Sequence, residues 1–288
     1  MFDWFFKFLF SSSVNLFASL LFIPLSSFGW EGEWTESSGK LKVAFHSWMA
    51  DPSMAVTGVF VLIPGYNGQG EELLDTRWKA FALANRLVLL APTFHAAGQE
   101  NNEGKGYYYP EQGSGLVMEN ALAELTRRTG VSTEQVMFFG FSAGAHFVHR
   151  FALWRPQRVK AFVAYSAGWW SEPTEELKSV PALIMCGEAD ERYAATFEFF
   201  KKGQRIGCPW VWRSYKGSAH QLTPAVRDMA EAYLAHYAGN PKASDDKWFG
   251  DIQTFKASGA EGRATIADEV RIELPSKVVA EVWEKESE

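Results

Sequence analysis

Cysteine is scarce in this chain, which has 288 residues but only two cysteines, Cys186 and Cys208. A small fold held together by several disulfides is therefore excluded, because one bridge at most can form. The pattern described below has Cys186 end one strand and Cys208 begin the next parallel strand, and opposite ends of such neighbours lie roughly 15 Å apart at about 3.3 Å per residue. We therefore expect two free, partly buried thiols.

The chain also lacks an excess of positive charge: 28 Lys and Arg stand against 34 Asp and Glu, which gives a formal net charge of −6. This balance argues against a nucleic-acid partner, which needs a clustered basic face. No group of cysteines, histidines and carboxylates has the spacing of metal ligands, so we expect no metal site. Hydrophobic residues make up 47% and charged residues 22%, as in an ordinary globular protein, and no internal repeat is visible.

The one apolar run that approaches membrane-spanning length lies within residues 1–29. It has a basic residue at Lys7, an apolar core at residues 14–25 and small residues up to Gly29. This order is typical of a secretory signal peptide cleaved near Gly29, so we expect a secreted or periplasmic protein that contacts the membrane only during export. An uncleaved membrane anchor is the alternative, and it is disfavoured because the run is short and interrupted by Pro24.

Apolar, β-rich runs then alternate with helical patterns. The runs are residues 41–48, 59–63, 87–92, 136–139, 159–165, 182–186 and 211–215. Several are continuous rather than alternating, as strands covered on both faces should be, and apolar stripes at helical spacing occupy residues 118–125 and 226–237. The alternation predicts one α/β domain over residues 30–239 with a mostly parallel sheet. Residues 240–288 are rich in Lys, Glu and Asp with few apolar anchors, so we expect an extension packed on the surface.

A candidate nucleophile follows the run at residues 136–139. The chain passes directly from that strand into Gly140-Phe141-Ser142-Ala143-Gly144. A sharp strand-to-helix turn needs small residues on both sides, because its central serine adopts strained backbone angles, and the helix that follows directs its N-terminal dipole at that serine. The pattern predicts Ser142 as a catalytic nucleophile, the alternative being a glycine-rich turn with an incidental serine.

A serine hydroxyl needs a base, and the base needs an orienting acid. The strand at residues 182–186 is followed by a glycine turn with Glu188 and Asp190, and the strand at residues 211–215 is followed by a loop with His220. Both loops leave the carboxyl ends of strands, where parallel sheets build their sites, and the order serine, acid, histidine is that of nucleophile-elbow hydrolases. We predict Asp190 as the acid, with Glu188 as the alternative, and His220 as the base.

The other five histidines are weaker candidates for a role in catalysis. We expect His146 and His149 to be packing or surface residues rather than metal ligands, because no glutamate accompanies their spacing. His46 and His236 fall in a strand and a helix pattern, and His95 could line a cleft but fits a structural role better.

Acyl transfer also needs hydrogen-bond donors for an oxyanion. One is expected from the backbone N–H of Ala143, directly after the nucleophile. The other is expected from Tyr66, in the loop at residues 64–68, because the glycines there allow backbone N–H groups to turn inward. The alternative for this loop is a mere glycine-rich turn.

With these motifs, residues 40–238 resemble the α/β-hydrolase superfamily of serine hydrolases. The stretch G-F-S-A-G-A-H-F, with R-P-Q-R-V-K-A-F-V-A-Y-S-A-G-W after it, more weakly resembles secreted esterases of the polyhydroxyalkanoate-depolymerase and feruloyl-esterase type. Such esterases often have His-Gly where Pro64-Gly65 stands here, and His where Cys186 stands. The resemblance implies an α/β-hydrolase fold with about eight strands flanked by helices, no cofactor, and a small-molecule or polymer-borne carboxylic ester as substrate.

Only residues 166–180 separate two of the predicted strands, which is too short for a substantial cap domain. We therefore expect an open cleft. Trp169 and Trp170 leave the strand end nearest Ser142, so they are candidate substrate-binding residues for a phenolic or sugar ring, although packing explains them equally well. The tyrosines at residues 107–109 are weaker candidates for the same face.

Three functions are compatible with these residues. A secreted serine esterase with a Ser-His-Asp triad is favoured. A serine peptidase of the same fold is second, because such peptidases usually carry a propeller or cap domain. A catalytically inactive binding module is third, because the set Ser142, Asp190 and His220 is intact.

Overall fold

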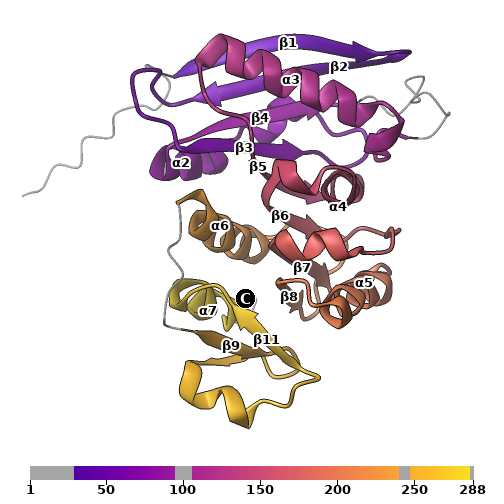
Figure 1. Cartoon of the computed structure of the whole chain (residues 1–288), viewed down its shortest axis with the longest axis vertical. Coiled ribbons are helices and arrows are strands. Elements are labelled where there is room, and N and C mark those ends of the chain that lie inside the picture. Colours follow the sequence, from indigo (N-terminus) through magenta and orange to yellow (C-terminus); the bar gives the residue numbers. More distant parts are fainter. Residues whose placement is uncertain (1–28, 95–105, 240–246, 286–288) are drawn as a thin grey trace, which may run out of the picture.

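The computed structural model describes residues 29–94, 106–239 and 247–285. A central sheet with helices packed against it forms most of the molecule, and a smaller sheet lies at the C-terminal end (Figure 1). The strands of the central sheet are β1 (Trp30–Ser38), β2 (Leu41–Met49), β3 (Gly58–Ile63), β4 (Leu87–Thr93), β5 (Val136–Phe141), β6 (Val159–Tyr165), β7 (Ala182–Gly187) and β8 (Trp210–Tyr215). The helices are α1 (Gly70–Leu73), α2 (Thr76–Asn85), α3 (Ser114–Thr129), α4 (Ala143–Trp154), α5 (Tyr193–Ile206), α6 (Pro224–Ala238) and α7 (Lys277–Trp283).

The eight strands of the central sheet have the order β1-β2-β4-β3-β5-β6-β7-β8. The pairs β1–β2 and β2–β4 are antiparallel, and every pair from β4 to β8 is parallel. This confirms the prediction of a mostly parallel sheet of about eight strands. Parallel strands bring their carboxyl ends to one edge, so the loops after β3, β5, β6, β7 and β8 can meet there.

Helices cover both faces of the sheet. Successive residues of a strand point to opposite faces, so a strand that is apolar at every position packs on helices on both sides. In β5, Phe138 packs on Phe151 of α4 with ring centroids 5.0 Å apart. Its neighbour Phe139 packs on Trp78 of α2, at 5.3 Å. The continuous apolar run of β5 is thus the signature of a strand covered twice.

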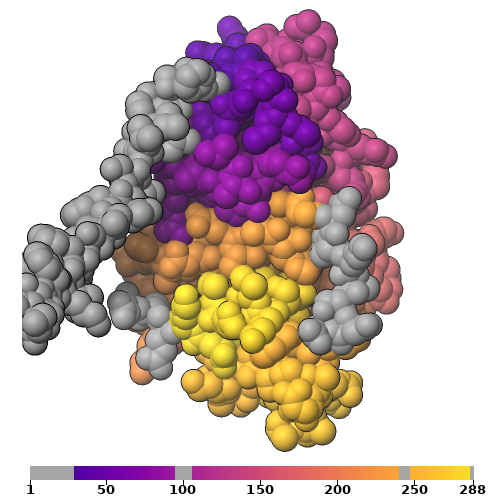
Figure 2. Space-filling view, turned by 90° about the vertical axis from the view of Figure 1, so that its left-hand side faces the viewer, coloured from indigo at the N-terminus to yellow at the C-terminus, as the bar shows by residue number. Residues whose placement is uncertain are grey.

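The C-terminal residues form a second, antiparallel sheet from β9 (Trp248–Asp251), β10 (Lys256–Ser258) and β11 (Arg271–Leu274), in the order β10-β9-β11. Helix α7 follows and lies beside α6, as the yellow and orange atoms in Figure 2 show. The expectation of few apolar anchors is wrong here. Trp283 of α7 is fully buried, and its indole N–H donates to the carbonyl of Trp212 in β8 over 2.6 Å.

The two cysteines are free and buried. Burial raises the pKa of the Cys186 thiol and raises that of Cys208 to about 11, so both thiols stay protonated near neutral pH. Over residues 29–94, 106–239 and 247–285, no helix has the length and apolar character that a membrane span requires. The predicted signal peptide lies almost wholly outside the described residues.

Candidate active site

The turn between β5 and α4 carries Ser142 in a strained conformation, with φ of 56°. Its flanking glycines are required by close packing. A Cβ on Gly140 would lie 2.3 Å from the carbonyl oxygen of Gly144, and a Cβ on Gly144 would lie 2.2 Å from that of Ile63 in β3. No larger residue fits at either position, so the G-x-S-x-G pattern here is the sequence of a tight nucleophile elbow.

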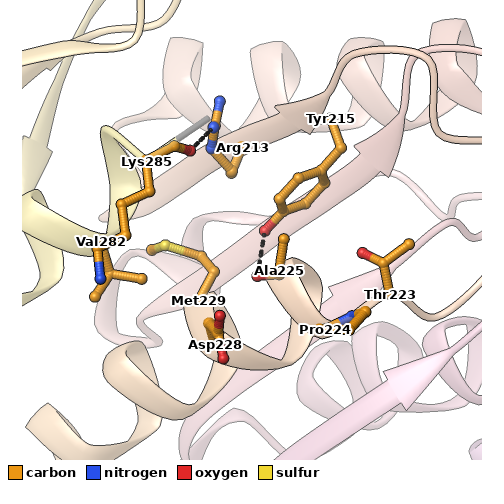
Figure 3. Close-up of a pocket in the computed structure, with 9 residues that line it drawn as sticks. All are labelled: Arg213, Tyr215, Thr223, Pro224, Ala225, Asp228, Met229, Val282 and Lys285. Atoms are coloured by element: carbon orange, nitrogen blue, oxygen red, sulfur yellow. Dashed lines mark hydrogen bonds between the residues drawn. The ribbon is translucent and has the colours of Figure 1, made fainter. Parts of the chain in front are cut away.

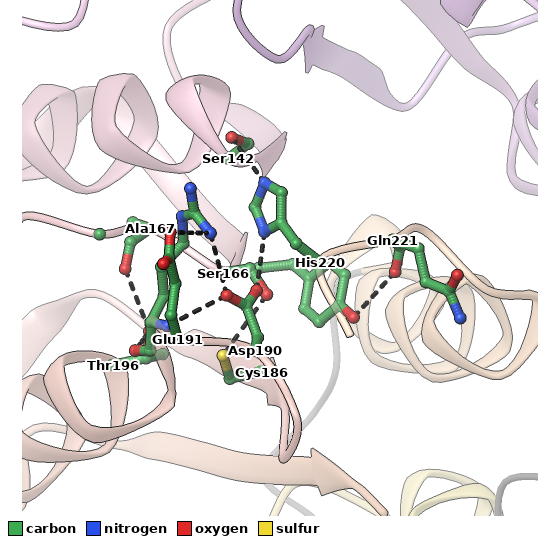
Figure 4. A network of polar contacts seen from close by, with 12 residues as sticks. Ser142, Ser166, Ala167, Cys186, Asp190, Glu191, Thr196, His220 and Gln221 are labelled. Carbon is green, nitrogen blue, oxygen red and sulfur yellow. Dashed lines mark hydrogen bonds and ion pairs between the residues drawn. The ribbon is translucent and has the colours of Figure 1, made fainter. Parts of the chain in front are cut away.

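The loops after β7 and β8 bring an acid and a base to this serine (Figure 4). His220 Nε2 lies 2.9 Å from the Ser142 hydroxyl, and His220 Nδ1 lies 2.7 Å from Oδ2 of Asp190. The Phe141 ring packs on the imidazole with centroids 4.7 Å apart. The Tyr165 hydroxyl donates to the carbonyl of Gln221 over 2.9 Å and so holds the histidine loop against β6. The three predicted residues therefore lie in the geometry of a Ser-His-Asp triad.

Asp190 is held as a carboxylate. Its side chain is fully buried, and burial alone would raise its pKa. The backbone amide and the guanidinium of Arg192 each donate to Oδ1 over 3.0 Å, and these bonds together with the one from His220 hold the pKa of Asp190 below its ordinary value. An ionised Asp190 accepts the Nδ1–H of His220 and leaves Nε2 free to take a proton from Ser142.

Glu188, the alternative acid, points elsewhere. Its carboxylate accepts a hydrogen bond of 2.8 Å from the hydroxyl of Ser214 in β8. The residues are two apart in one loop, and only Asp190 reaches His220.

A cavity of about 470 Å³ opens beside the elbow. It is lined by Tyr66, Tyr108, Ser142, Ala143, His146, Gly168, Trp169, Glu191, Arg192 and Ala195. Aromatic rings form much of its wall, and an ion pair of 3.1 Å joins Arg192 to Glu191 on one side. A flat apolar group with some polar substituents matches such a lining.

Both predicted oxyanion-hole residues line this cavity with Ser142. Ala143 opens helix α4, and the first amides of a helix have no intrahelical acceptor. The loop of Tyr66 approaches the elbow closely, since a Cβ on Gly65 would lie 3.7 Å from that of Ser142. The Tyr66 side chain itself is exposed at the cavity rim.

The two predicted substrate-binding tryptophans have different surroundings. Trp169 lines the cavity and is 68% exposed. Trp170 is outside the cavity lining and stacks on Phe199 of α5 with ring centroids 4.1 Å apart. Trp170 is therefore a packing residue, and its expected role in substrate binding is corrected. The two residues lie in a bent, irregular segment after β6, and of the pair only Trp169 lines the cavity.

Tyr108, one of the weaker tyrosine candidates, also lines the cavity. Five further residues of the lining had no predicted role at the site: His146, Gly168, Glu191, Arg192 and Ala195. His146 was expected to pack or to lie at the surface, and it does pack: it is buried and lines the cavity. Of the other tyrosines, Tyr107 is buried and donates its hydroxyl to the carbonyl of Pro64 over 3.1 Å. His95 lies outside the described residues.

A second cavity, of about 520 Å³, lies between β8, α6 and α7 (Figure 3). Its lining includes Arg213, Tyr215, Asp228, Met229 and Val282, and the Tyr215 hydroxyl donates to the carbonyl of Ala225 over 3.3 Å. None of the triad residues lines it. Within the described part of the chain, no three or more histidines, cysteines and carboxylates are grouped to hold a metal ion.

Comparison with known proteins finds no matching family model and no matching curated protein. Solved structures do match. A ferulic acid esterase is 17% identical with a TM-score of 0.55, over 67% of this chain and 92% of that one. The poly(3-hydroxybutyrate) depolymerase LpqC from Bordetella parapertussis is 19% identical with a TM-score of 0.56, over 74% of this chain and 91% of that one. An S-formylglutathione hydrolase from Agrobacterium tumefaciens is 17% identical with a TM-score of 0.57, over 73% of this chain and 95% of that one.

In the described residues no cap domain interrupts the sheet, since only the 3₁₀ segment Glu175–Ser179 lies between β6 and β7. The strand order, the elbow between β5 and α4 and the likeness to these hydrolases show that the chain has the α/β-hydrolase fold.

Proposed function

We propose that this protein is a serine hydrolase that cleaves carboxylic esters through an acyl-enzyme. The observation that carries the proposal is the continuous chain of hydrogen bonds from Ser142 through His220 to Asp190, next to an aromatic-lined cavity. A serine that merely terminates a strand needs neither a strained φ nor a histidine oriented by a buried carboxylate.

In the proposed reaction, the Ser142 oxygen attacks the ester carbonyl carbon while its proton passes to His220 Nε2. The carbonyl oxygen becomes an oxyanion that accepts hydrogen bonds from the amides of Ala143 and Tyr66. The C–O bond then breaks, and His220 returns the proton to the departing alcohol. Water attacks the acyl-enzyme by the same route, which releases the carboxylic acid and restores Ser142. Asp190 stays ionised throughout and stabilises the imidazolium.

The aromatic lining supports a finer proposal, that the substrate is an ester of an aromatic acid or an ester carried on a polymer. Tyr66 and Trp169 are 62% and 68% exposed at the rim, where they can stack on a ring that extends out of the cavity. The absence of a cap over the described site leaves room for a bulky or chain-like substrate. One neighbour is named as a ferulic acid esterase, which agrees with an ester of an aromatic acid. Another is named as a poly(3-hydroxybutyrate) depolymerase, which agrees with a polymer-borne ester.

A panel of substrates separates this proposal from its alternatives. Esters of acetic, ferulic and 3-hydroxybutyric acids test esterase activity, and peptide anilides test peptidase activity. Ester hydrolysis with no anilide cleavage supports the proposal, and the reverse supports a peptidase. A folded protein that hydrolyses none of them, and whose Ser142 does not react with a fluorophosphonate, is a binding module.

The composition of residues 1–29 leads us to propose also that the protein is exported to the periplasm or the medium, as a mature chain with a hydrolase domain at residues 30–239 and an extension at residues 240–288. N-terminal sequencing of the protein recovered from each cell fraction tests this. We expect an exported chain that begins close to Trp30, directly after Gly29. A chain that keeps Met1 and stays with the membrane fraction would support the uncleaved anchor instead.

A further inference from the structure

Three polar side chains of α4 bind the segment that leaves β6. We call His146, His149 and Arg150 the α4 polar cluster. His146 Nε2 accepts the amide N–H groups of Gly168 over 2.7 Å and Trp169 over 3.2 Å. His149 Nε2 accepts that of Ser171 over 3.1 Å. Three amides of this irregular segment thus find their acceptors on one helix.

Arg150 completes the cluster and links it to a second segment. Its guanidinium donates to the Trp169 carbonyl over 3.2 Å and to the Ser171 hydroxyl over 3.0 Å. It also donates to the Tyr108 carbonyl over 3.0 Å. Tyr108 and Trp169 are both cavity-lining residues, and they lie on segments far apart in the sequence. One arginine therefore fixes the backbone of both.

The His146 imidazole lies between the same two aromatic side chains. Its centroid is 5.5 Å from that of Tyr108, edge to face, and 5.4 Å from that of Trp169. To accept two N–H groups at Nε2, the ring must be neutral with its proton on Nδ1. Burial favours this state, since it lowers the pKa of His146 to about 3. The ring is thus locked in one tautomer and one orientation.

We infer that His146 and Arg150 are positioning residues that set the separation of Tyr108 and Trp169 and thereby determine the preference of the site for esters with an aromatic ring. They touch no reacting atom and act through the two aromatic walls. This inference rests on the proposed function, which supplies the ester. It goes further because it assigns selectivity to buried residues of α4 rather than to the triad.

The test compares two esters with the same leaving group, 4-nitrophenyl acetate and 4-nitrophenyl 3-phenylpropanoate. His146→Leu removes the acceptor and keeps an apolar side chain, whereas His146→Gln places an amide oxygen near the position of Nε2. We expect His146→Leu to lower kcat/KM for the phenylpropanoate at least about tenfold more than for the acetate, mainly through KM. His146→Gln should restore most of the selectivity.

A second comparison shows whether His146 acts through Trp169. Trp169→Ala should reproduce the loss of selectivity, and the double variant should lose little more than the larger single loss, because coupled residues are not additive. His236→Leu is the matched control, since His236 lies on α6 outside the cavity lining, and it should leave both rates unchanged. If His146→Leu does not fold, as judged by circular dichroism, His146→Asn replaces it, because its amide is too short to reach the Nε2 position.

Equal losses of kcat/KM on both esters in folded His146→Leu or His146→Asn, or losses that multiply with those of Trp169→Ala, would overturn the inference. A wild-type protein that hydrolyses neither ester and resists fluorophosphonate overturns the proposed function and this inference with it. A wild-type protein that hydrolyses both esters, with no change of selectivity in folded His146→Leu or His146→Asn, overturns the inference alone.

Discussion

His220 Nδ1 lies 2.7 Å from Oδ2 of Asp190, while Glu188, two residues earlier in the same loop, binds the hydroxyl of Ser214. The two carboxylates thus have separate partners. Asp190 faces the imidazole, and Glu188 faces β8.

This difference predicts the outcome of two matched substitutions. Asp190→Asn should lower kcat by several powers of ten, because an amide favours the wrong tautomer of His220. Glu188→Gln removes one charge from the same loop. It should lower kcat less than about threefold, because the Glu188 side chain contacts Ser214 and not His220. Steady-state kinetics on one activated ester measure both. An exchange of the two results would make Glu188 the acid.

Removal of the nucleophile should abolish turnover and spare the fold. Ser142→Ala deletes one hydroxyl from a serine at the cavity wall, so little packing is lost. We expect residual kcat below about a thousandth of the wild-type value, with an unchanged far-ultraviolet circular dichroism spectrum. A folded variant that retains more activity than this would show that another group attacks the ester.

Acid should destabilise the fold through the histidines of α4. Burial lowers the pKa of His146 to about 3 and lowers that of His149 as well, whereas the pKa of a histidine in the unfolded chain is about 6.5. Below that pH the unfolded chain binds protons that the folded chain does not. Through His146 the free energy of unfolding therefore rises with pH from about 3 to about 6.5, by up to about 1.4 kcal/mol per pH unit. His149 contributes in the same direction.

Urea unfolding of the wild type and of His146→Gln, at about pH 5 and about pH 7, isolates this contribution. The free energy of unfolding of the variant should depend less steeply on pH. The difference in slope corresponds to about one proton bound on unfolding, because glutamine does not titrate. Identical slopes in the two proteins would mean that His146 is protonated in the folded state, which its two accepted hydrogen bonds forbid.

The C-terminal segment should contribute to the stability of the whole domain through Trp283. Trp283→Ala removes a fully buried indole together with its hydrogen bond to Trp212, and it should cost about 3–5 kcal/mol of unfolding free energy. Val278→Ala in the same helix is the control, because Val278 is 63% exposed and should change the stability by less than about 0.5 kcal/mol. Equal effects of both would show that α7 is only loosely attached.

The features that the sequence predicted are those with a local signature. The elbow needs small residues within two positions of Ser142, and covered strands such as β5 read as continuous apolar runs, so both are visible without a structure. Strand β1 was not among the predicted runs. It lies at the edge of the sheet, and exposed glutamates such as Glu31 and Glu33 alternate with its inward-facing residues.

The missed features depend on partners that are distant in the sequence. Trp170 turns away from the cavity because Phe199 of α5 offers it a stacking surface. Trp283 is one of several buried anchors in the C-terminal segment, and its partner, Trp212, lies 71 residues away. His146 accepts backbone N–H groups, which every residue except proline carries, so nothing in the sequence marks its partners.

The central claim, that Ser142 is a nucleophile activated by His220, is tested most directly by mass spectrometry after treatment with a fluorophosphonate. We predict one adduct per chain, located on the peptide that contains Ser142, and no adduct in folded Ser142→Ala. His220→Ala should react much more slowly, because the hydroxyl then lacks its base. A folded wild-type protein that forms no adduct, or one whose adduct persists in Ser142→Ala, would contradict the account.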